Sequence, residues 1–256
     1  MKHDIIKNVR DNSPLIHHLT NHVVENFSAN GLLSFGAIPV MGKAVDEAAD
    51  MASVADGVLL NIGTLTSAEL PSMILAGQAA NAKGAPVLLD PVGVAATPFR
   101  RTAVKTILEN VKPTVIKGNA GELAHLVDIP WETKGVDSIG EGRVDEIAAS
   151  VSEKFQTVSI ATGQTDIISV DNDIIHNRTG HPLLSKVTGS GCLLGSVVAA
   201  CLTTADPIKE QVTAAVTFYG LAGEYAMKHP HVKGPGTFLP HFIDALSLDP
   251  EEIERT

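Results

Sequence analysis

The chain has 256 residues, 44% of them hydrophobic, and a formal net charge of −10. This length can bury a large core, and no linker, low-complexity tract or long-period repeat divides it, so we expect one domain over residues 1–256. The negative charge argues against a nucleic-acid or anionic-membrane partner and favours small ligands. No signal-peptide core or membrane-length apolar run is present, so the expected location is the cytoplasm.

Near the N-terminus, His18 and His22 would share one face of a helix and could bind a metal ion. No carboxylate or third ligand follows at a familiar spacing. We therefore expect capping and hydrogen-bonding roles here, with Thr20 or Asn21 as the N-cap of a helix that runs to Phe35.

An apolar run over 37–40 leads to Met41, which indicates the end of a strand. A thioether there could form a wall for a flat heteroaromatic ring, although methionine more often fills a core. Four further apolar runs each stop at a polar residue. They are Gly57–Leu60 before Asn61, Pro86–Leu89 before Asp90, Thr114–Ile116 before Lys117, and Val158–Ala161 before Thr162.

Continuous apolar strands indicate a parallel sheet covered on both faces, and helical patterns at about 68–83, 101–110 and 144–155 separate them. The expected class is therefore α/β with a mostly parallel central sheet. Residues 167–170 and 174–175 flank a turn-forming Asp-Asn-Asp sequence, which predicts an antiparallel hairpin at the sheet edge. After the glycine-rich turn at 187–192 the chain is expected to be helical. Asp206 would cap a long helix to about Lys228 with Pro207 in its first turn, and a last helix is expected over Leu239–Leu246.

Ligands of open α/β sheets bind beyond the carboxyl ends of the strands, where Gly63, Asp90, Lys117 and Thr162 are expected. Phosphoryl transfer needs a cation near the migrating charge and acidic groups that hold hydrated Mg²⁺. Lys117, Glu122 and Asp90 supply both kinds of group. The alternative is that Glu122 only occupies the first turn of a helix, where it interacts favourably with the dipole.

The glycine-rich turn 187–192 runs directly into an alanine-rich apolar segment over 193–202. Small residues at a helix start leave backbone N–H groups free to bind a phosphate-sized anion. Cys192 would bring a sulfur atom to the same place, and helix starts lower the pKa of a thiol. The alternative is a helix start that is glycine-rich by chance. A Walker A loop is excluded, because no lysine precedes Ser196, and a dinucleotide fingerprint is disfavoured.

Six segments of the chain carry a resemblance to a known family: 19–27, 36–41, 61–65, 89–93, 118–122 and 186–192. Together they resemble the hydroxyethylthiazole kinases of thiamine salvage, which belong to the ribokinase-like superfamily. The resemblance covers nearly the whole chain in the same order and is weak only near 131–145 and after 229. It implies a three-layer α/β/α fold and transfer of the ATP γ-phosphoryl group, with Mg²⁺, to the hydroxyethyl oxygen of 4-methyl-5-(2-hydroxyethyl)thiazole. It also implies a homotrimer with substrate pockets at the subunit boundaries.

The same resemblance assigns roles to individual residues. The thiazole pocket would be lined by Asn21, Met41, Gly63 and Gly189; ATP would contact Lys117 and Thr162; Mg²⁺ would be held by Asp90 and Glu122; and the catalytic anion hole would comprise Gly189, Ser190 and Gly191. Cys192 occupies the position where sugar kinases of the superfamily have an aspartate base. This departure leaves the identity of the base open.

Other hypotheses remain at this point. A hydroxymethylpyrimidine kinase or an ATP-dependent hydrate-repair dehydratase of the same superfamily is disfavoured by the match at the N-terminus. A non-kinase with Cys192 as a covalent nucleophile lacks a clear His-Asp pairing in the sequence. A non-enzymatic thiazole or nucleotide sensor could dispense with Lys117 and Glu122, whose presence argues against it.

Overall fold

The computed structural model describes residues 1–131 and 141–255, so part of the weakly matching stretch near 131–145 lies outside the described residues. Within them, eight strands form one sheet in the order β2-β1-β3-β4-β5-β6-β7-β8. The strands are β1 Leu15–Leu19, β2 Ile38–Val40, β3 Gly57–Asn61, β4 Val87–Asp90, β5 Val115–Asn119, β6 Val158–Thr162, β7 Asp166–Val170 and β8 Asp173–Asn177. Strands β1 to β6 pair in parallel, whereas β7 and β8 are antiparallel.

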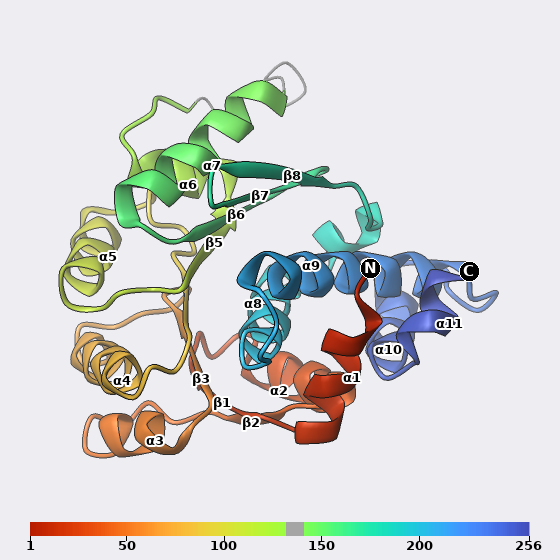
Figure 1. The fold of residues 1–256 in the computed structure, drawn as a ribbon, viewed down its shortest axis with the longest axis horizontal. Helices are drawn as coiled ribbons and strands as arrows, with labels where there is room; N and C mark the ends of the chain where they lie inside the picture. Colours follow the sequence, from red (N-terminus) through yellow and green to blue (C-terminus); the bar gives the residue numbers. More distant parts are fainter. Residues whose placement is uncertain (132–140, 256) are drawn as a thin grey trace.

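Helices cover both faces of this sheet, which confirms the predicted three-layer α/β/α arrangement (Figure 1). One face carries α3 Ala48–Val54, α4 Leu70–Lys83, α5 Pro98–Asn110, α6 Ala120–Leu126 and α7 Glu141–Phe155. The other carries α1 His3–Asn12, α2 Glu25–Phe35, α8 Ser190–Cys201, α9 Ile208–Lys228, α10 Pro235–Leu246 and α11 Pro250–Glu254. No described helix is long and apolar enough to cross a membrane.

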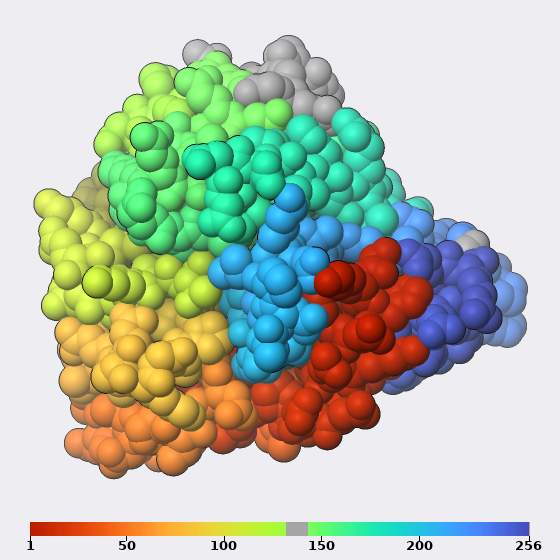
Figure 2. All heavy atoms as spheres, in the orientation of Figure 1, coloured from red at the N-terminus to blue at the C-terminus, as the bar shows by residue number. Residues whose placement is uncertain are grey.

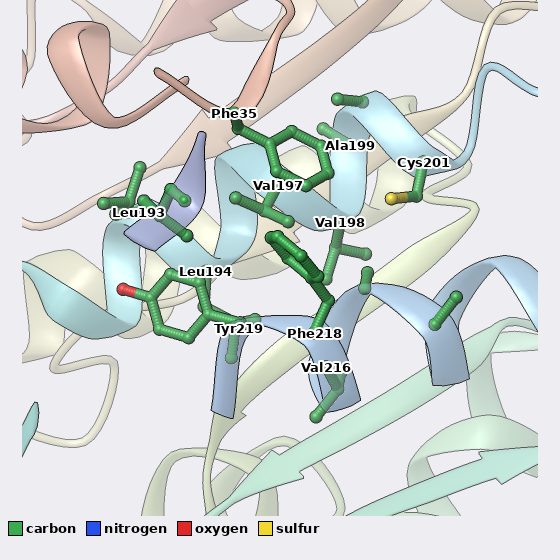
Figure 3. Close-up of a cluster of buried hydrophobic side chains, with 14 of the residues drawn as sticks. Phe35, Leu193, Leu194, Val197, Val198, Ala199, Cys201, Val216, Phe218 and Tyr219 are labelled. Atoms are coloured by element: carbon green, nitrogen blue, oxygen red, sulfur yellow. The ribbon is translucent and has the colours of Figure 1, made fainter. Parts of the chain in front are cut away.

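Helix α8 lies between the sheet and α9 (Figure 1). Figure 3 shows its apolar side chains, such as Val198, beside Phe218 of α9. Every residue from Cys192 to Cys201 is buried, as expected for a helix that is apolar on all sides. Phe218 of α9 packs against Phe35 of α2 with ring centroids 5.6 Å apart. This core fixes α8 and therefore fixes the glycine-rich turn at its start.

The two ends of the chain pack against each other, which the sequence patterns did not predict. Figure 2 shows α1 beside the C-terminal helices. Lys7 of α1 forms an ion pair with Glu251 at 2.7 Å, and the N-terminal ammonium reaches Glu254 at 3.0 Å. Together α1 and α11 complete the outer layer beside α9.

Most predicted strands and the β7–β8 hairpin are confirmed, but some predicted boundaries are wrong. His18 lies on strand β1, so it shares no helix face with His22. Helix α2 begins at Glu25, and neither Thr20 nor Asn21 caps it. The Val24 N–H donates to the Asn21 carbonyl at 3.2 Å, so the segment before α2 turns once and leaves the Asn21 side chain free to reach the site.

The C-terminal helices also differ from their predicted limits. Pro207 itself is the N-cap of α9, and no side chain caps that helix. Helix α10 begins at Pro235 instead of near Leu239 and contains Pro240. Pro235 occupies the first turn, where its missing N–H costs no hydrogen bond. The helix can therefore begin at a proline, earlier than predicted.

Candidate active site

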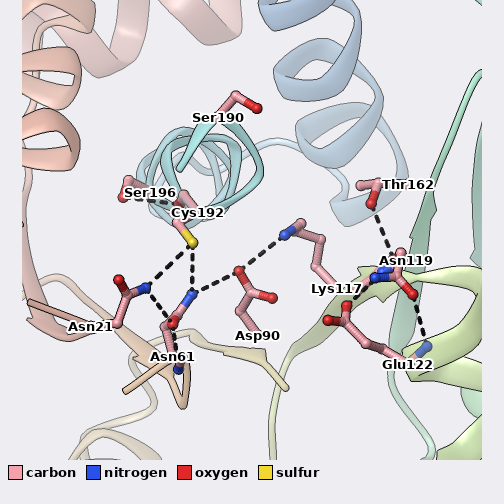
Figure 4. Close-up of polar contacts among 12 residues, drawn as sticks. Asn21, Asn61, Asp90, Lys117, Asn119, Glu122, Thr162, Ser190, Cys192 and Ser196 are labelled. Carbon is pink, nitrogen blue, oxygen red and sulfur yellow. Dashed lines mark hydrogen bonds and ion pairs between the residues drawn. The ribbon is translucent and has the colours of Figure 1, made fainter. Parts of the chain in front are cut away.

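The carboxyl ends of β3, β4 and β5 bring three polar side chains into one buried network (Figure 4). Asn61 and Asp90 are opposite each other in the register of β3 and β4. Asn61 Nδ2 donates to Asp90 Oδ2 at 2.9 Å, and Lys117 Nζ donates to the same oxygen at 3.0 Å. The predicted convergence of Asp90 and Lys117 at this edge is therefore present.

Lys117 and Asp90 form an almost completely buried ion pair, with side chains 4% and 1% exposed. Burial alone would lower the pKa of Lys117, but the Asp90 carboxylate, with Cys192 and Glu122 nearby, outweighs it and raises that pKa. Burial also raises the pKa of Asp90, against the opposing effects of Lys117 and Asn61. We assign the ionised form to Asp90, because its Oδ2 accepts two hydrogen bonds and a neutral carboxyl would leave a buried ammonium without a counter-charge.

Helix α8 approaches this network closely because its facing residues are small. A Cβ on Gly195 would lie 3.4 Å from Leu59, 3.5 Å from Leu88 and 3.8 Å from Asp90 Oδ2. A Cβ on Gly191 would lie 3.6 Å from Lys117 Nζ. The first turn of α8 is thereby placed directly over the charged pair.

The turn before α8 requires glycine and leaves backbone donors free. Gly189 has φ +87°, and a Cβ there would meet Val24 at 2.4 Å. Within residues 1–131 and 141–255, the N–H groups of Gly189, Gly191 and Cys192 have no protein acceptor. Together with the positive end of the helix dipole, these donors can bind an anion.

Ser190 contributes to this turn in a different way from its neighbours. Its N–H donates to Val187 O at 3.2 Å and its hydroxyl donates to Leu184 O at 2.7 Å. Its carbonyl accepts a hydrogen bond from the Tyr219 hydroxyl at 2.5 Å. Both Ser190 donors are thus engaged in holding the loop, and the free N–H of Cys192 lies next to that of Gly191.

The Cys192 sulfur lies between two amide groups at the inner end of the network. Asn21 Nδ2 and Asn61 Nδ2 approach Sγ at 3.5 Å and 3.3 Å. The position at a helix start led us to expect a lowered thiol pKa, and this is wrong. Burial and the Asp90 carboxylate raise the pKa of Cys192 more than Lys117 and the two amides lower it. The group is a neutral thiol at neutral pH.

Asn61 is the centre of this network, and our sequence analysis assigned it no role. Its Oδ1 accepts hydrogen bonds from the Gly63 N–H at 2.9 Å and from Asn21 Nδ2 at 3.0 Å. A backbone N–H can only donate, so this contact fixes the orientation of the amide and turns Nδ2 towards Asp90 and Cys192. The sequence signals were its place at the end of an apolar strand, where ligands of such sheets bind, and in the segment 61–65 that carries the family resemblance.

Asn21 and Gly63, both predicted to contact the thiazole, lie next to each other. A Cβ on Gly63 would be 2.7 Å from Asn21 Nδ2, so no other residue fits there without displacing the amide. Met41 follows the edge strand β2 and is half-buried. It lies at the carboxyl edge of the sheet, two strands away from β3.

A cavity of about 950 Å³ opens on the other side of the α8 start. Thr162, Ser190 and Gly191 line it, together with the segment 178–182 and Tyr219. A nucleotide could therefore reach the free N–H groups from this side. A second cavity of about 610 Å³ lies near Thr114 and Val158, at the amino ends of β5 and β6, and contains none of the predicted site residues.

The two predicted metal ligands have different surroundings. Asp90 Oδ1 is buried and has no protein partner, so one carboxylate oxygen remains available. The Glu122 carboxylate accepts the N–H of Asn119 at 2.8 Å and that of Gly93 at 2.7 Å. Asn119 caps α6 in a capping box with Glu122, so the structural role considered for Glu122 is present.

A buried histidine of β1 forms a hydrogen bond with α8. His18 Nδ1 contacts the Ile16 carbonyl at 2.9 Å and therefore carries the proton, so Nε2 accepts from the Ser196 hydroxyl at 3.0 Å. Burial lowers the pKa of His18 to about 4. This neutral imidazole joins β1 to α8 one turn after Cys192.

Comparisons with known proteins show the family of this chain. The family model described as the hydroxyethylthiazole kinase family matches residues 6–251. This chain belongs to that family. Hydroxyethylthiazole kinase 1 of Oceanobacillus iheyensis is 62% identical over 253 residues, which are 99% of this chain and 98% of the relative.

Solved structures give the same result at the level of the fold. The structure of a hydroxyethylthiazole kinase protein from Pyrococcus horikoshii OT3 has a TM-score of 0.89 and 36% identity, and the match covers 99% of this chain and 95% of that one. A ribokinase-like superfamily protein from Enterococcus faecalis V583 has a TM-score of 0.68 at 14% identity, with coverage of 100% and 95%. The predicted ribokinase-like fold is confirmed.

The buried His18 makes the stability of the fold depend on pH. Its pKa is lower in the folded chain than in the unfolded chain, so its contribution is complete above about pH 6.5 and is lost as the pH falls towards 4. We expect the free energy of unfolding of the wild type to fall by about 3 kcal/mol more than that of His18→Gln over this interval. Urea unfolding between pH 4 and 7.5 measures both profiles. Parallel profiles would show that His18 titrates normally in the folded chain.

Proposed function

We propose that this chain transfers the γ-phosphoryl group of ATP to the hydroxyethyl oxygen of 4-methyl-5-(2-hydroxyethyl)thiazole, as a step of thiamine salvage. The observation that carries the proposal is the first turn of α8. In a chain of the hydroxyethylthiazole kinase family, its free N–H groups lie over a buried lysine–aspartate pair. Phosphoryl transfer depends mainly on positioning and on stabilising negative charge, and these groups supply both.

The two substrates would approach the α8 turn from opposite sides. ATP would occupy the cavity lined by Thr162, with its γ-phosphate near Gly191 and the Lys117 ammonium. The thiazole would lie against Asn21, Met41, Gly63 and Gly189. Cys192 and Asn61 then lie between the two sides, next to the point of transfer.

Mg²⁺ fits the acidic groups of this site. Asp90 and Glu122 would hold the ion and its waters, and the unpartnered Asp90 Oδ1 is the observation that supports this. Bound Mg²⁺ would neutralise charge that develops on the phosphate oxygens. The hydrogen bonds from Asn119 and Gly93 keep the Glu122 carboxylate in a fixed orientation.

The thiolate form of Cys192 would accept the hydroxyl proton of the substrate, and the backbone N–H groups would contribute more to the rate. Burial and the Asp90 carboxylate disfavour this form, and a neutral thiol cannot take up the proton. The loose transition state of phosphoryl transfer, however, requires little help from a base. The raised pKa also argues against Cys192 as a covalent nucleophile, because a nucleophilic cysteine needs its thiolate form.

We also propose that the chain forms a homotrimer with the acceptor pocket at the subunit boundary. Large apolar side chains are exposed around the edge strand β2: Val23 at 61%, Leu33 at 55%, Ile38 at 46% and Val45 at 45%. This is the edge where Met41 lies. An exposed apolar sheet edge is a typical site of association.

The first test is acceptor choice. With ATP and hydroxyethylthiazole we expect ADP and the phosphorylated thiazole to form in equal amounts, and removal of Mg²⁺ with a chelator should stop the reaction. Hydroxymethylpyrimidine and a sample without acceptor are the controls. Turnover that is equal without an acceptor, or that needs the pyrimidine, would contradict the proposed function.

Variants of Cys192 test how the proton is removed. Cys192→Asp should retain or raise kcat, because Asn21 and Asn61 can donate to the new carboxylate, whereas Cys192→Ala should lose only part of kcat. Cys201→Ala, a change at the other buried cysteine of the same helix, is the matched control. Single-turnover transfer at saturating ATP separates chemistry from ATP binding. An aspartate variant slower than the alanine variant would refute the base assignment.

Light scattering at micromolar concentration tests the trimer. We expect the mass of three chains for the wild type and dissociation of Ile38→Glu, because a charge at β2 would be buried without a partner. Val54→Glu, a change at an exposed apolar residue of α3, is the control. A monomeric wild type with full activity would contradict a shared acceptor pocket.

A further inference from the structure

Arg100 lies in the first turn of α5 and binds three backbone carbonyls. Nη1 donates to Ile62 O at 2.8 Å and to Val92 O at 2.6 Å, and Nη2 donates to Gly63 O at 2.5 Å. The helix start itself is fixed, because the Thr97 side chain accepts the Arg100 N–H at 3.2 Å. The guanidinium is thus held in a defined place on a regular element.

The three carbonyls belong to the loops that follow β3 and β4. The first loop contains Gly63, which contacts Asn21 and Asn61, and the second begins directly after Asp90. Among the ion pairs of the described residues, none involves Arg100, so its charge faces only carbonyl dipoles. Each of these bonds is charge-assisted and stronger than a bond from a neutral donor.

The second loop is also held from its other side. Gly93 has φ +66° and donates its N–H to Glu122 Oε1 at 2.7 Å. A Cβ on Gly93 would lie 3.4 Å from Arg100 Nη1. Val92 O is therefore bound by Arg100 while the N–H of Gly93 is bound by Glu122, so the Val92–Gly93 peptide unit has little freedom to rotate.

We infer that Arg100 is a positioning residue. It fixes the loop after β3, which contains Gly63, relative to the loop after β4, which contains Val92. The kinetic part of this inference rests on the proposed function, whereas the structural part does not. Arg100 itself contacts neither Asn21 nor Asp90 and acts through Gly63 and Val92. Lysine cannot replace it, because only the planar guanidinium presents donors in a fixed fork that spans separate acceptors.

Hydrogen exchange of the ligand-free protein tests the structural part. We expect Arg100→Gln and Arg100→Lys to raise the exchange rate of the Gly63 and Gly93 amides by roughly tenfold or more, because these loops then open locally at lower cost. Arg101→Gln is the matched control. Arg101 is the next residue on α5, and its guanidinium donates to a single carbonyl, Ala95 O, at 3.0 Å. Unchanged exchange of both amides in the Arg100 variants would overturn the inference.

Steady-state kinetics of the same variants test the consequence for the site. We expect the KM for hydroxyethylthiazole and the Mg²⁺ concentration for half-maximal rate to rise roughly tenfold, with the KM for ATP within about twofold of wild type. ATP binding is spared because its cavity is lined by other elements. Guanidinium ion at low millimolar concentration should partly restore the thiazole KM of Arg100→Ala and leave Arg101→Ala unchanged.

The outcomes separate the two proposals. A wild type without kinase activity would refute the proposed function, while the exchange experiment would still decide the role of Arg100. An active wild type whose Arg100 variants lose kcat alone, or whose thiazole and ATP constants rise equally, would show that Arg100 only stabilises the fold. Guanidinium that lowers the thiazole KM of Arg100→Ala while its KM for ATP stays unchanged would support the positioning role.

Discussion

The close approach of α8 to the sheet is the constraint on which the site depends. Small residues along its inner side let the helix lie within van der Waals contact of the ends of β3 and β4, as Gly195 shows. The same contact brings the first turn of α8 over Asp90 and Lys117. His18 and Ser196 add a hydrogen bond between β1 and α8. A larger side chain at Gly195 would lift the free N–H groups away from the charges that they are arranged to complement.

The charges of the site are unevenly distributed, and this determines what it can bind. Lys117 compensates Asp90, whereas Glu122 adds a second carboxylate whose oxygens are bound by backbone N–H groups. The strand ends therefore carry an excess of negative charge, and the α8 turn carries unpaired donors. A cation fits the first region and an anion fits the second. In the proposed function, a magnesium-bound triphosphate would supply both charges.

Local patterns in the sequence predicted the strands other than β1, the hairpin and the glycine-rich turn, because apolar periodicity and turn residues act over a few positions. They did not identify Asn61 or Arg100, whose roles depend on contacts between distant segments. Arg100 lies just before the helix predicted over about 101–110, and only the fold shows that its guanidinium meets carbonyls 38 and 8 residues away in the chain. The prediction of a lowered pKa for Cys192 was wrong for the same reason. The helix start was visible in the sequence, but the burial and the nearby Asp90 were not.

The surroundings of Cys192 explain how a thiol can stand where related sugar kinases have an aspartate. A carboxylate at this depth would lie beside Asp90, and two negative groups so close would compete for the charge of Lys117. A neutral thiol avoids that repulsion while the site is empty, and it can act as a base only after it has lost its own proton to form a thiolate. The amide donors of Asn21 and Asn61 would stabilise that thiolate. Under the proposed function, a thiol is therefore a weaker base than an aspartate but causes less electrostatic repulsion in the empty site, and the backbone donors of α8 would contribute more to the rate.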